Sequence, residues 1–331
     1  MAKKIFALLL LLSLLSPISS AQRRARISPR NAENILTEQD LYLDVQFLSD
    51  TLCQGRRTGT PGSQFAAMWI AGQFDAAGLK TFGNSRFQSF RTPAGPTGHN
   101  VLGFLPGTAV QGKRYIVIGA HFDHQGILGG ALYPGADSNA SGVVAMIQLA
   151  RMLSYMTEID RPFAKSVIFV AFDGKSSNMS GSTNLVGRLL EGSLRDPVTG
   201  APITAKDVDL MVNIDQIGCD LAPLSHVWKE YIIMLSDEKS QRRVPLTSVD
   251  LEYRIGLDIG FTYYDSKDFT RLFFRKVCDQ KAFLDAGIES VLFTSGITMN
   301  NNKTQDTVDT INTSLLRKRI ILIYYWLRRY L

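Results

Sequence analysis

The stretch YIVIGAHFDHQG, residues 115–126, joins an apolar run to a cluster of polar side chains. Residues 115–120 are apolar or small, which is typical of a strand that is buried on both faces of a sheet. His121 and Asp123 follow that strand directly. Because ligands of open α/β sheets bind beyond the carboxyl ends of the strands, we expect the functional site at this end.

The rest of the chain repeats the alternation of strands and helices. Further short apolar runs predict strands at 166–172, 210–214, 231–235 and 290–294. Helical spacing of apolar residues predicts helices at 40–52, 63–79, 143–153, 182–190, 281–286 and 313–330. This order predicts an α/β fold, a three-layer α/β/α sandwich around a mostly parallel mixed sheet. The polar segments 192–206 and 236–267 are expected to be irregular excursions on the rim.

The first 21 residues have the features of a secretory signal peptide. Lys3 and Lys4 form a basic start, 5–15 is an apolar run, and Ser19 and Ala21 are the small residues before a cleavage point. The apolar run is too short to span a bilayer, which needs ~20 residues. We therefore expect a secreted or periplasmic protein with no integral membrane segment after the signal is removed.

Beyond the signal, we expect a flexible leader over 22–39 and a single domain over 40–331. The formal charge of the chain is +6, and it falls to +4 without Lys3 and Lys4. Basic residues of the final helix, 317–319 and 328–329, flank an apolar run, so we interpret them as a solvated face and expect no nucleic-acid partner. Three cysteines are too few for a disulfide scaffold, although one bridge is possible.

Several polar motifs after apolar runs appear in a fixed order along the chain. They are GAHFDHQG (119–126), GADSNASG (135–142), VAFDGKSS (170–177), VNIDQIG (212–218) and KTQDT (303–307). Their order and spacing resemble the zinc aminopeptidases with two co-catalytic metals, a family that also includes the glutaminyl cyclases. The resemblance runs from about Leu43 to the C-terminus and includes GRRTGTPG (55–62) and FLDAGIESVLFTSG (283–296). The single domain is therefore expected to be zinc-exopeptidase-like.

The resemblance implies a role for each polar residue of the early motifs. His121 and Asp215 match two ligands of the first zinc, and Asp123 matches the residue that orients the ligand environment, because an imidazole ligand needs such support. Asp137 is a possible third ligand, although we favour its other interpretation, a cap of the helix that begins near residue 141. His124 matches a common structural accompaniment.

Four positions depart from the pattern of the family. Ser138 stands where a carboxylate bridges the two zinc ions, and Ser176 and Asn302 stand at ligand positions of the second zinc. Lys175 stands at the position of the general base, and its ammonium would repel a metal. The chain is therefore identified as a member with a degenerate metal site. Its histidines are His99, His121, His124 and His226, so none follows residue 226.

These departures lead to a first hypothesis, a secreted zinc-aminopeptidase-like protein whose two-zinc site is largely lost. It would be a non-catalytic or redirected member that binds a peptide or amino-terminal ligand in the cleft, with zero or one zinc ion per chain. Unpaired buried charges are costly, so Lys175 is expected to pair with Asp215 or Asp137.

Two catalytic alternatives remain open. One is an active single-zinc exopeptidase or glutaminyl cyclase that uses His121 and Asp215, with Asp137 as a possible third ligand. The other is a Ser/Lys hydrolase built on Lys175 with Ser176 or Ser177, although adjacent loop residues rarely have the required geometry.

Overall fold

The computed structural model describes residues 29–109, 111–159, 161–220 and 229–331. The predicted signal peptide, residues 1–21, lies outside the described residues. Within the described residues, no helix has both the length and the apolar composition that crossing a membrane requires.

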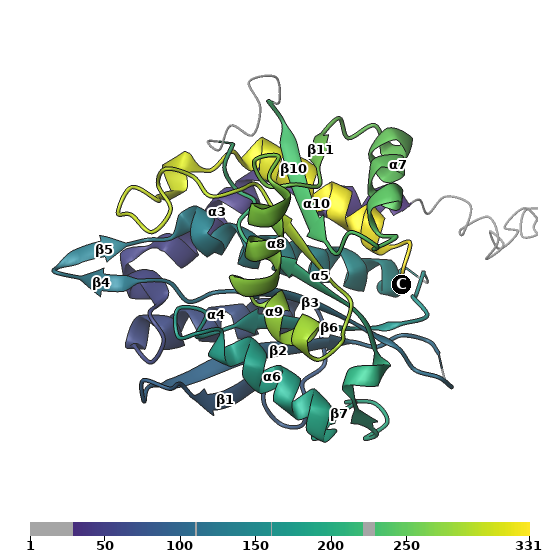
Figure 1. Cartoon of the computed structure of the whole chain (residues 1–331). Helices are drawn as coiled ribbons and strands as arrows, with labels where there is room; N and C mark the ends of the chain where they lie inside the picture. Colours follow the sequence, from purple (N-terminus) through teal and green to yellow (C-terminus); the bar gives the residue numbers. More distant parts are fainter. Residues whose placement is uncertain (1–28, 110, 160, 221–228) are drawn as a thin grey trace, which may run out of the picture.

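A mixed sheet of eight strands forms the centre of the described chain (Figure 1). In spatial order the strands are β1 (Phe87–Arg91), β2 (Thr97–Leu105), β6 (Ser166–Phe172), β3 (Tyr115–His121), β9 (Val208–Ile214), β12 (Ser290–Thr294), β10 (Tyr231–Ser236) and β11 (Asp258–Gly260). The four central strands β6, β3, β9 and β12 are parallel, whereas β2 and β10 pair antiparallel with β6 and β12. Two small hairpins lie outside this sheet, β4 (Gly126–Leu128) with β5 (Ala131–Tyr133) and β7 (Leu194–Arg195) with β8 (Pro202–Ile203).

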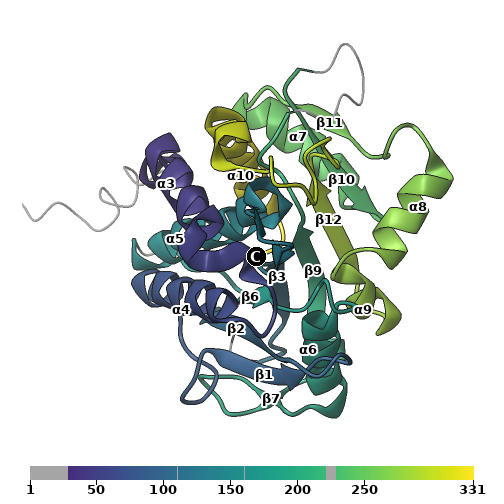
Figure 2. The same ribbon diagram turned by 90° about the vertical axis from the view of Figure 1, so that its left-hand side faces the viewer.

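Helices cover both faces of the sheet (Figure 2). One face carries α3 (Glu38–Ser49), α4 (Pro61–Ala76), α5 (Gly142–Glu158), α7 (Arg243–Tyr253) and α10 (Thr313–Leu327). The other carries α6 (Ser180–Glu191), α8 (Lys267–Lys276) and α9 (Gln280–Asp285). Because strand side chains alternate, Val167 and Phe169 of β6 pack in the first layer, and Ile168 and Val170 pack in the second. The predicted three-layer sandwich around a mostly parallel mixed sheet is confirmed.

The largest difference from the expected elements lies in segment 236–267. We expected an irregular excursion, but α7 forms there and buries Leu246 and Val249 in the core. β11 then pairs in parallel with β10 and extends the sheet by one strand. The sequence gives little sign of α7, because only these two of its residues are buried.

The chain is ordered earlier than the leader 22–39 predicted. Residues Pro29–Ile35 form a short 3-10 helix, and Ala32 and Leu36 are buried in the main core. Nε of Arg317 donates to the carbonyl of Leu36 at 2.9 Å, which joins this segment to α10. The prediction of a flexible leader is therefore wrong for residues 29–39.

Helix α10 does not present its basic residues uniformly to solvent. Arg319 is completely buried and donates to the carbonyls of Tyr231, Ile217 and Cys219 at 2.7–2.8 Å. The interpretation of residues 317–319 as a solvated face is wrong for Arg319, whose guanidinium joins the final helix to β10 and to the turn after β9.

Candidate functional site

Three neighbouring parallel strands, β6, β3 and β9, bring the polar motifs to one edge of the sheet. β3 ends at His121, Lys175 lies three residues beyond the end of β6, and Asp215 directly follows β9. These three residues line a cavity of about 680 Å³. The expected location beyond the carboxyl ends of the strands agrees with this cavity.

Lys175 lies at the centre of this group. Its ammonium forms an ion pair with Oδ2 of Asp215, and its Nζ lies 3.1 Å from Nε2 of His121. Nε2 of His121 is also 3.4 Å from Oδ1 of Asp215. We expected Lys175 to pair with Asp215 or Asp137, and its partner in the structure is Asp215.

The charges of this group stabilise one another. Burial is the largest single influence and disfavours the charged form of Lys175, but the Asp215 carboxylate, with smaller contributions from neighbouring groups, raises the pKa of Lys175. Burial likewise opposes ionisation of Asp215, yet Lys175 and His121 hold its pKa well below the ordinary value. Burial and Lys175 lower the pKa of His121, while Asp215 and Asp123 raise it, with a net rise to about 9.

Asp123 holds the loop that carries Lys175 in place. Its Oδ1 accepts a hydrogen bond from the backbone amide of Lys175 at 2.9 Å. Its Oδ2 accepts from the amide and the hydroxyl of Ser176 at 3.0 and 2.9 Å. The backbone carbonyl of Asp123 lies 3.0 Å from Nδ1 of His121. Asp123 therefore orients both His121 and the segment at the family's base position.

Asp137 does not join His121 and Asp215. Its Oδ1 accepts from the amide of Gly218 at 2.7 Å and from the hydroxyl of Ser141 at 3.1 Å. Its Oδ2 accepts from Nε2 of Gln216 at 3.2 Å. The carboxylate thus binds the turn after β9, and the structure does not place Asp137 as a third ligand beside His121 and Asp215.

The cap of α5 also differs from the expectation for Asp137. The side chain of Asn139, not that of Asp137, accepts the amide of Gly142 at 3.1 Å. Nδ2 of Asn139 donates to the carbonyl of Ile214 at 2.8 Å, so the start of α5 is fixed against the end of β9.

The remaining altered positions lie around the same cavity. Ser138 and Asn302 both line it. The amide of Ser138 donates to Oδ2 of Asp306 at 3.0 Å, and Oδ1 of Asn302 accepts from Gln125 at 3.2 Å. Neither side chain supplies a carboxylate or an imidazole where the family has one.

The Ser/Lys alternative lacks its central contact. The ammonium of Lys175 is directed to Asp215 and His121, whereas Oγ of Ser176 donates to Asp123. Among the described residues, no hydrogen bond joins Lys175 Nζ to the hydroxyl of Ser176 or Ser177. The geometry therefore does not support a nucleophile–base pair at these positions.

Sequence reasoning assigned no role to Arg56, whose side chain contacts the segments that surround the site. Its guanidinium is completely buried and donates to the carbonyls of Phe122, Pro134, Gly135 and Leu48, at 2.7–2.8 Å for the first three. It therefore ties the loop after β3 to the segment that leads into α5. The motif 55–62 contains Arg56, but nothing in the sequence indicates that its partners are backbone carbonyls.

The donor set does not fit a divalent metal ion. Within the described ranges, no three His, Cys, Asp or Glu side chains are grouped so that they could hold one. The two remaining candidate ligands, His121 and Asp215, both have the Lys175 ammonium within hydrogen-bond distance. A metal at that position would face a fixed positive charge and would lack a third carboxylate or imidazole.

Comparison with known proteins was made on the sequence and on the fold. The family model for peptidase family M28 matches residues 100–327, which is more than half of the chain. The alkaline phosphatase isozyme conversion protein of Escherichia coli is 29% identical over 182 residues, covering 50% of this chain and 48% of that protein. Aminopeptidase YwaD of Bacillus subtilis is 24% identical over 132 residues, covering 40% of this chain and 24% of that protein. The chain thus spans about half or less of the length of these relatives.

Solved structures with the same fold include both enzyme types of the expected resemblance. The glutaminyl cyclase of Fimbriiglobus ruber has a TM-score of 0.68 at 17% identity, covering 88% of this chain and 95% of that chain. The aminopeptidase from Aneurinibacillus sp. strain AM-1 has a TM-score of 0.65 at 16% identity, covering 91% and 95%. The zinc aminopeptidase BSAP of Bacillus subtilis has a TM-score of 0.66 at 13% identity, covering 89% and 95%. At these identities the likeness concerns the fold alone.

Proposed function

The chain belongs to peptidase family M28, and from this premise we propose that it is a secreted member that binds a peptide or amino-terminal ligand without two-zinc hydrolysis. The observation that carries the proposal is the contact of the Lys175 ammonium with both Asp215 and His121. The cation is part of the chain, so the carboxylate is neutralised without any bound ion.

The cost of removing Lys175 from this position supports the proposal further. Asp215 is 5% exposed, and a buried carboxylate without a partner is strongly unfavourable. For a metal to bind between Asp215 and His121, the ammonium would have to leave its partner and turn toward solvent. Metal binding therefore competes with an ion pair that is already formed.

The lining of the cleft suits a peptide. One part of it is rich in amides and hydroxyls, which can pair with backbone groups: Gln125, Ser138, Asn178, Asn301 and Asn302. Another part is apolar and can accept a side chain: Met179, Phe273, Val277 and Ile297. This combination is typical of sites in which polar groups orient a ligand and apolar groups contribute area.

A second candidate is a single-zinc exopeptidase or glutaminyl cyclase, which is compatible with the fold that the chain shares with the F. ruber glutaminyl cyclase. Such an enzyme would use His121 and Asp215 and would need a proton shuttle. The nearby Asp173 is engaged elsewhere, because it accepts from the hydroxyl of Thr58 at 2.7 Å and from the amide of His99 at 3.0 Å.

Elemental analysis of protein purified without chelator separates these functions. We expect no stoichiometric zinc and no turnover of aminoacyl-nitroanilides or of amino-terminal glutamine peptides when zinc is added. Two tightly held zinc ions would refute the proposal. One ion, together with turnover that His121→Ala abolishes, would establish the second candidate.

Peptide binding is tested by calorimetry with short peptides that carry a free or an acetylated amino terminus. Val277 lines the cleft, so Val277→Trp is expected to fill it and weaken binding. Val244→Trp is the matched control, because Val244 is 71% exposed on α7 and does not line the cleft. Equal binding by both variants would count against the cleft as the binding site.

A further inference from the structure

A second cavity, of about 670 Å³, opens where β10 ends between α7, α8 and the segment after β11. Its lining is distinct from that of the cleft described above. Helix α8 separates the two cavities, since Phe273 lines the cleft and Phe274 lines the second cavity. Its volume lies within the range of small-molecule sites, which is about 300–1,000 Å³.

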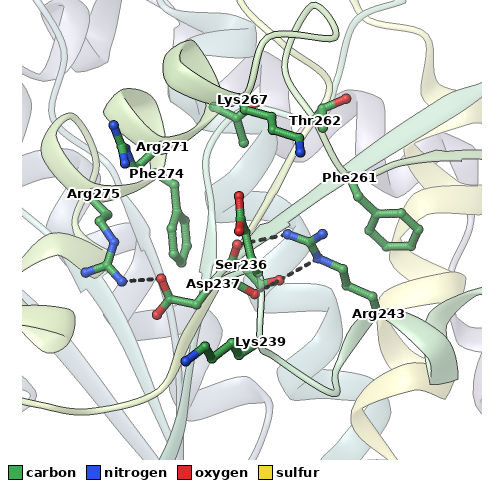
Figure 3. Close-up of a pocket in the computed structure, with 12 residues that line it drawn as sticks. Ser236, Asp237, Lys239, Arg243, Phe261, Thr262, Lys267, Arg271, Phe274 and Arg275 are labelled. Atoms are coloured by element: carbon green, nitrogen blue, oxygen red, sulfur yellow. Dashed lines mark hydrogen bonds and ion pairs between the residues drawn. The ribbon is translucent and has the colours of Figure 1, made fainter.

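The lining of this cavity has an excess of positive charge. Five basic side chains contribute to it: Lys239, Arg243, Lys267, Arg271 and Arg275. The acidic side chains are Asp237 and Glu238, which leaves an excess of three positive charges. Of these acids, Asp237 is paired with Arg275 (Figure 3).

Arg243 is the most firmly positioned of the cations. Its Nε and Nη2 donate to the hydroxyl and the carbonyl of Ser236, both at 3.0 Å. Its guanidinium lies 5.5 Å from the centre of the Phe261 ring, which is a favourable cation–π distance. The two bonds to Ser236 use two of the five N–H groups of a guanidinium and leave the others for a ligand.

Lys267 reaches the same space from the start of α8. In Figure 3 the side chains of Arg243 and Lys267 point into the space between the rings of Phe261 and Phe274. Among the described residues, the Lys267 ammonium forms no hydrogen bond or ion pair. Arg243 is half-buried, so its attraction for an anion is screened less by salt than that of a fully exposed charge.

From this arrangement we propose that the cavity is a binding site for a small organic polyanion that carries at least two phosphate or carboxylate groups. One anionic group lies at the free N–H groups of Arg243, and the second is held by the Lys267 ammonium, which enters the same space (Figure 3). Guanidinium groups suit the planar geometry of carboxylates and phosphates, which accept paired hydrogen bonds. This site is independent of the function proposed for the cleft.

The test is calorimetric titration of the full chain, at low salt, with two probes, inorganic pyrophosphate and citrate. Saturable binding of either probe is expected, with the dissociation constant about tenfold or more higher in Arg243→Gln and in Lys267→Gln. Binding of both probes shows that carboxylates suffice, and binding of pyrophosphate alone shows that phosphate is required.

Lys206→Gln is the control, because Lys206 is an exposed lysine that does not line the cavity. This variant should bind both probes as the wild type does. Lys267→Gln keeps the test decisive if loss of the Arg243 bonds impairs folding. No saturable binding to the wild type would overturn the proposal. So would equal affinities for the wild type and the Lys267 variant, or an equal loss in the Lys206 variant.

Discussion

The ammonium nitrogen of Lys175 lies 3.1 Å from Nε2 of His121, and both groups contact the carboxylate of Asp215. In the family that the chain belongs to, the resemblance assigns that histidine and that aspartate to a metal. Here a side chain of the protein provides the positive charge. The Asp215 carboxylate is thereby kept ionised in a buried position.

If this ion pair replaces a metal charge, removing the carboxylate is expected to be costly. Asp215→Asn leaves the Lys175 ammonium beside the buried imidazole of His121 without its carboxylate partner, and we expect a loss of about 3 kcal/mol in the free energy of unfolding. The control is Asp285→Asn, which breaks the exposed pair with Lys281 and should cost about 1 kcal/mol or less. Urea unfolding measures both. A similar small effect in both variants would show that Lys175 finds other compensation.

The same pair makes a prediction about pH. The folded-state pKa of Asp215 is depressed, so its contribution to stability is present above its ordinary pKa, about 3.9, and is lost as the pH falls below that value. The difference in unfolding free energy between the wild type and Asp215→Asn should shrink as the pH falls below about 4. Urea titrations at several pH values measure this difference. A difference that grows as the pH falls below about 4 would contradict the assignment.

Restoring the donors tests whether four side chains account for the altered site. The variant Ser138→Asp, Lys175→Glu, Ser176→Glu, Asn302→His replaces each departure by the residue type of the family. We expect it to retain zinc after desalting, because it regains carboxylate and imidazole ligands and loses the ammonium. Lys175→Met is the control, since it removes the charge and adds no ligand. Zinc retention by the wild type equal to that of the fourfold variant would rule out this account.

The central strands were predictable because they consist almost entirely of apolar residues, as is typical of strands buried on both faces. Residues 166–172 form β6 with the expected bounds, and every position is buried. The antiparallel strands β1, at the edge of the sheet, and β2, beside it, were missed because their inward positions include polar residues. Buried Asn100 of β2 donates to Oε1 of Gln88 on β1 at 2.8 Å and to the carbonyl of Gly181 at 2.9 Å, so its partners lie on other segments. Such a pairing is not visible in either strand alone.

The site was predictable to the extent that it depends on strand ends. His121, Lys175 and Asp215 meet because each lies at or just after the end of a strand, as predicted, and because β6, β3 and β9 are neighbours in the sheet. The direction of the Asp137 carboxylate was not predictable, because it depends on the amide of Gly218, eighty-one residues away. The roles of Arg56 and Arg319 were not predicted for the same reason, since their partners are backbone carbonyls of distant segments.

Arg56 gives the last prediction, because it connects three segments that surround the site. Arg56→Met keeps the apolar stem but removes all donors to the carbonyls of Leu48, Phe122, Pro134 and Gly135, which are then buried without these partners. We expect the free energy of unfolding to fall by about 3 kcal/mol or more, since hydrogen bonds from a charged group contribute about 1.5–3 kcal/mol each and are not fully additive. Because Phe122 separates His121 from Asp123, the imidazole resonances of His121 should also shift in NMR spectra of the folded variant. The neighbouring Arg57 is exposed, so Arg57→Met is the matched control and should leave both measurements close to the wild type. A stability loss without any change at His121 would mean that Arg56 supports the core but does not position the site.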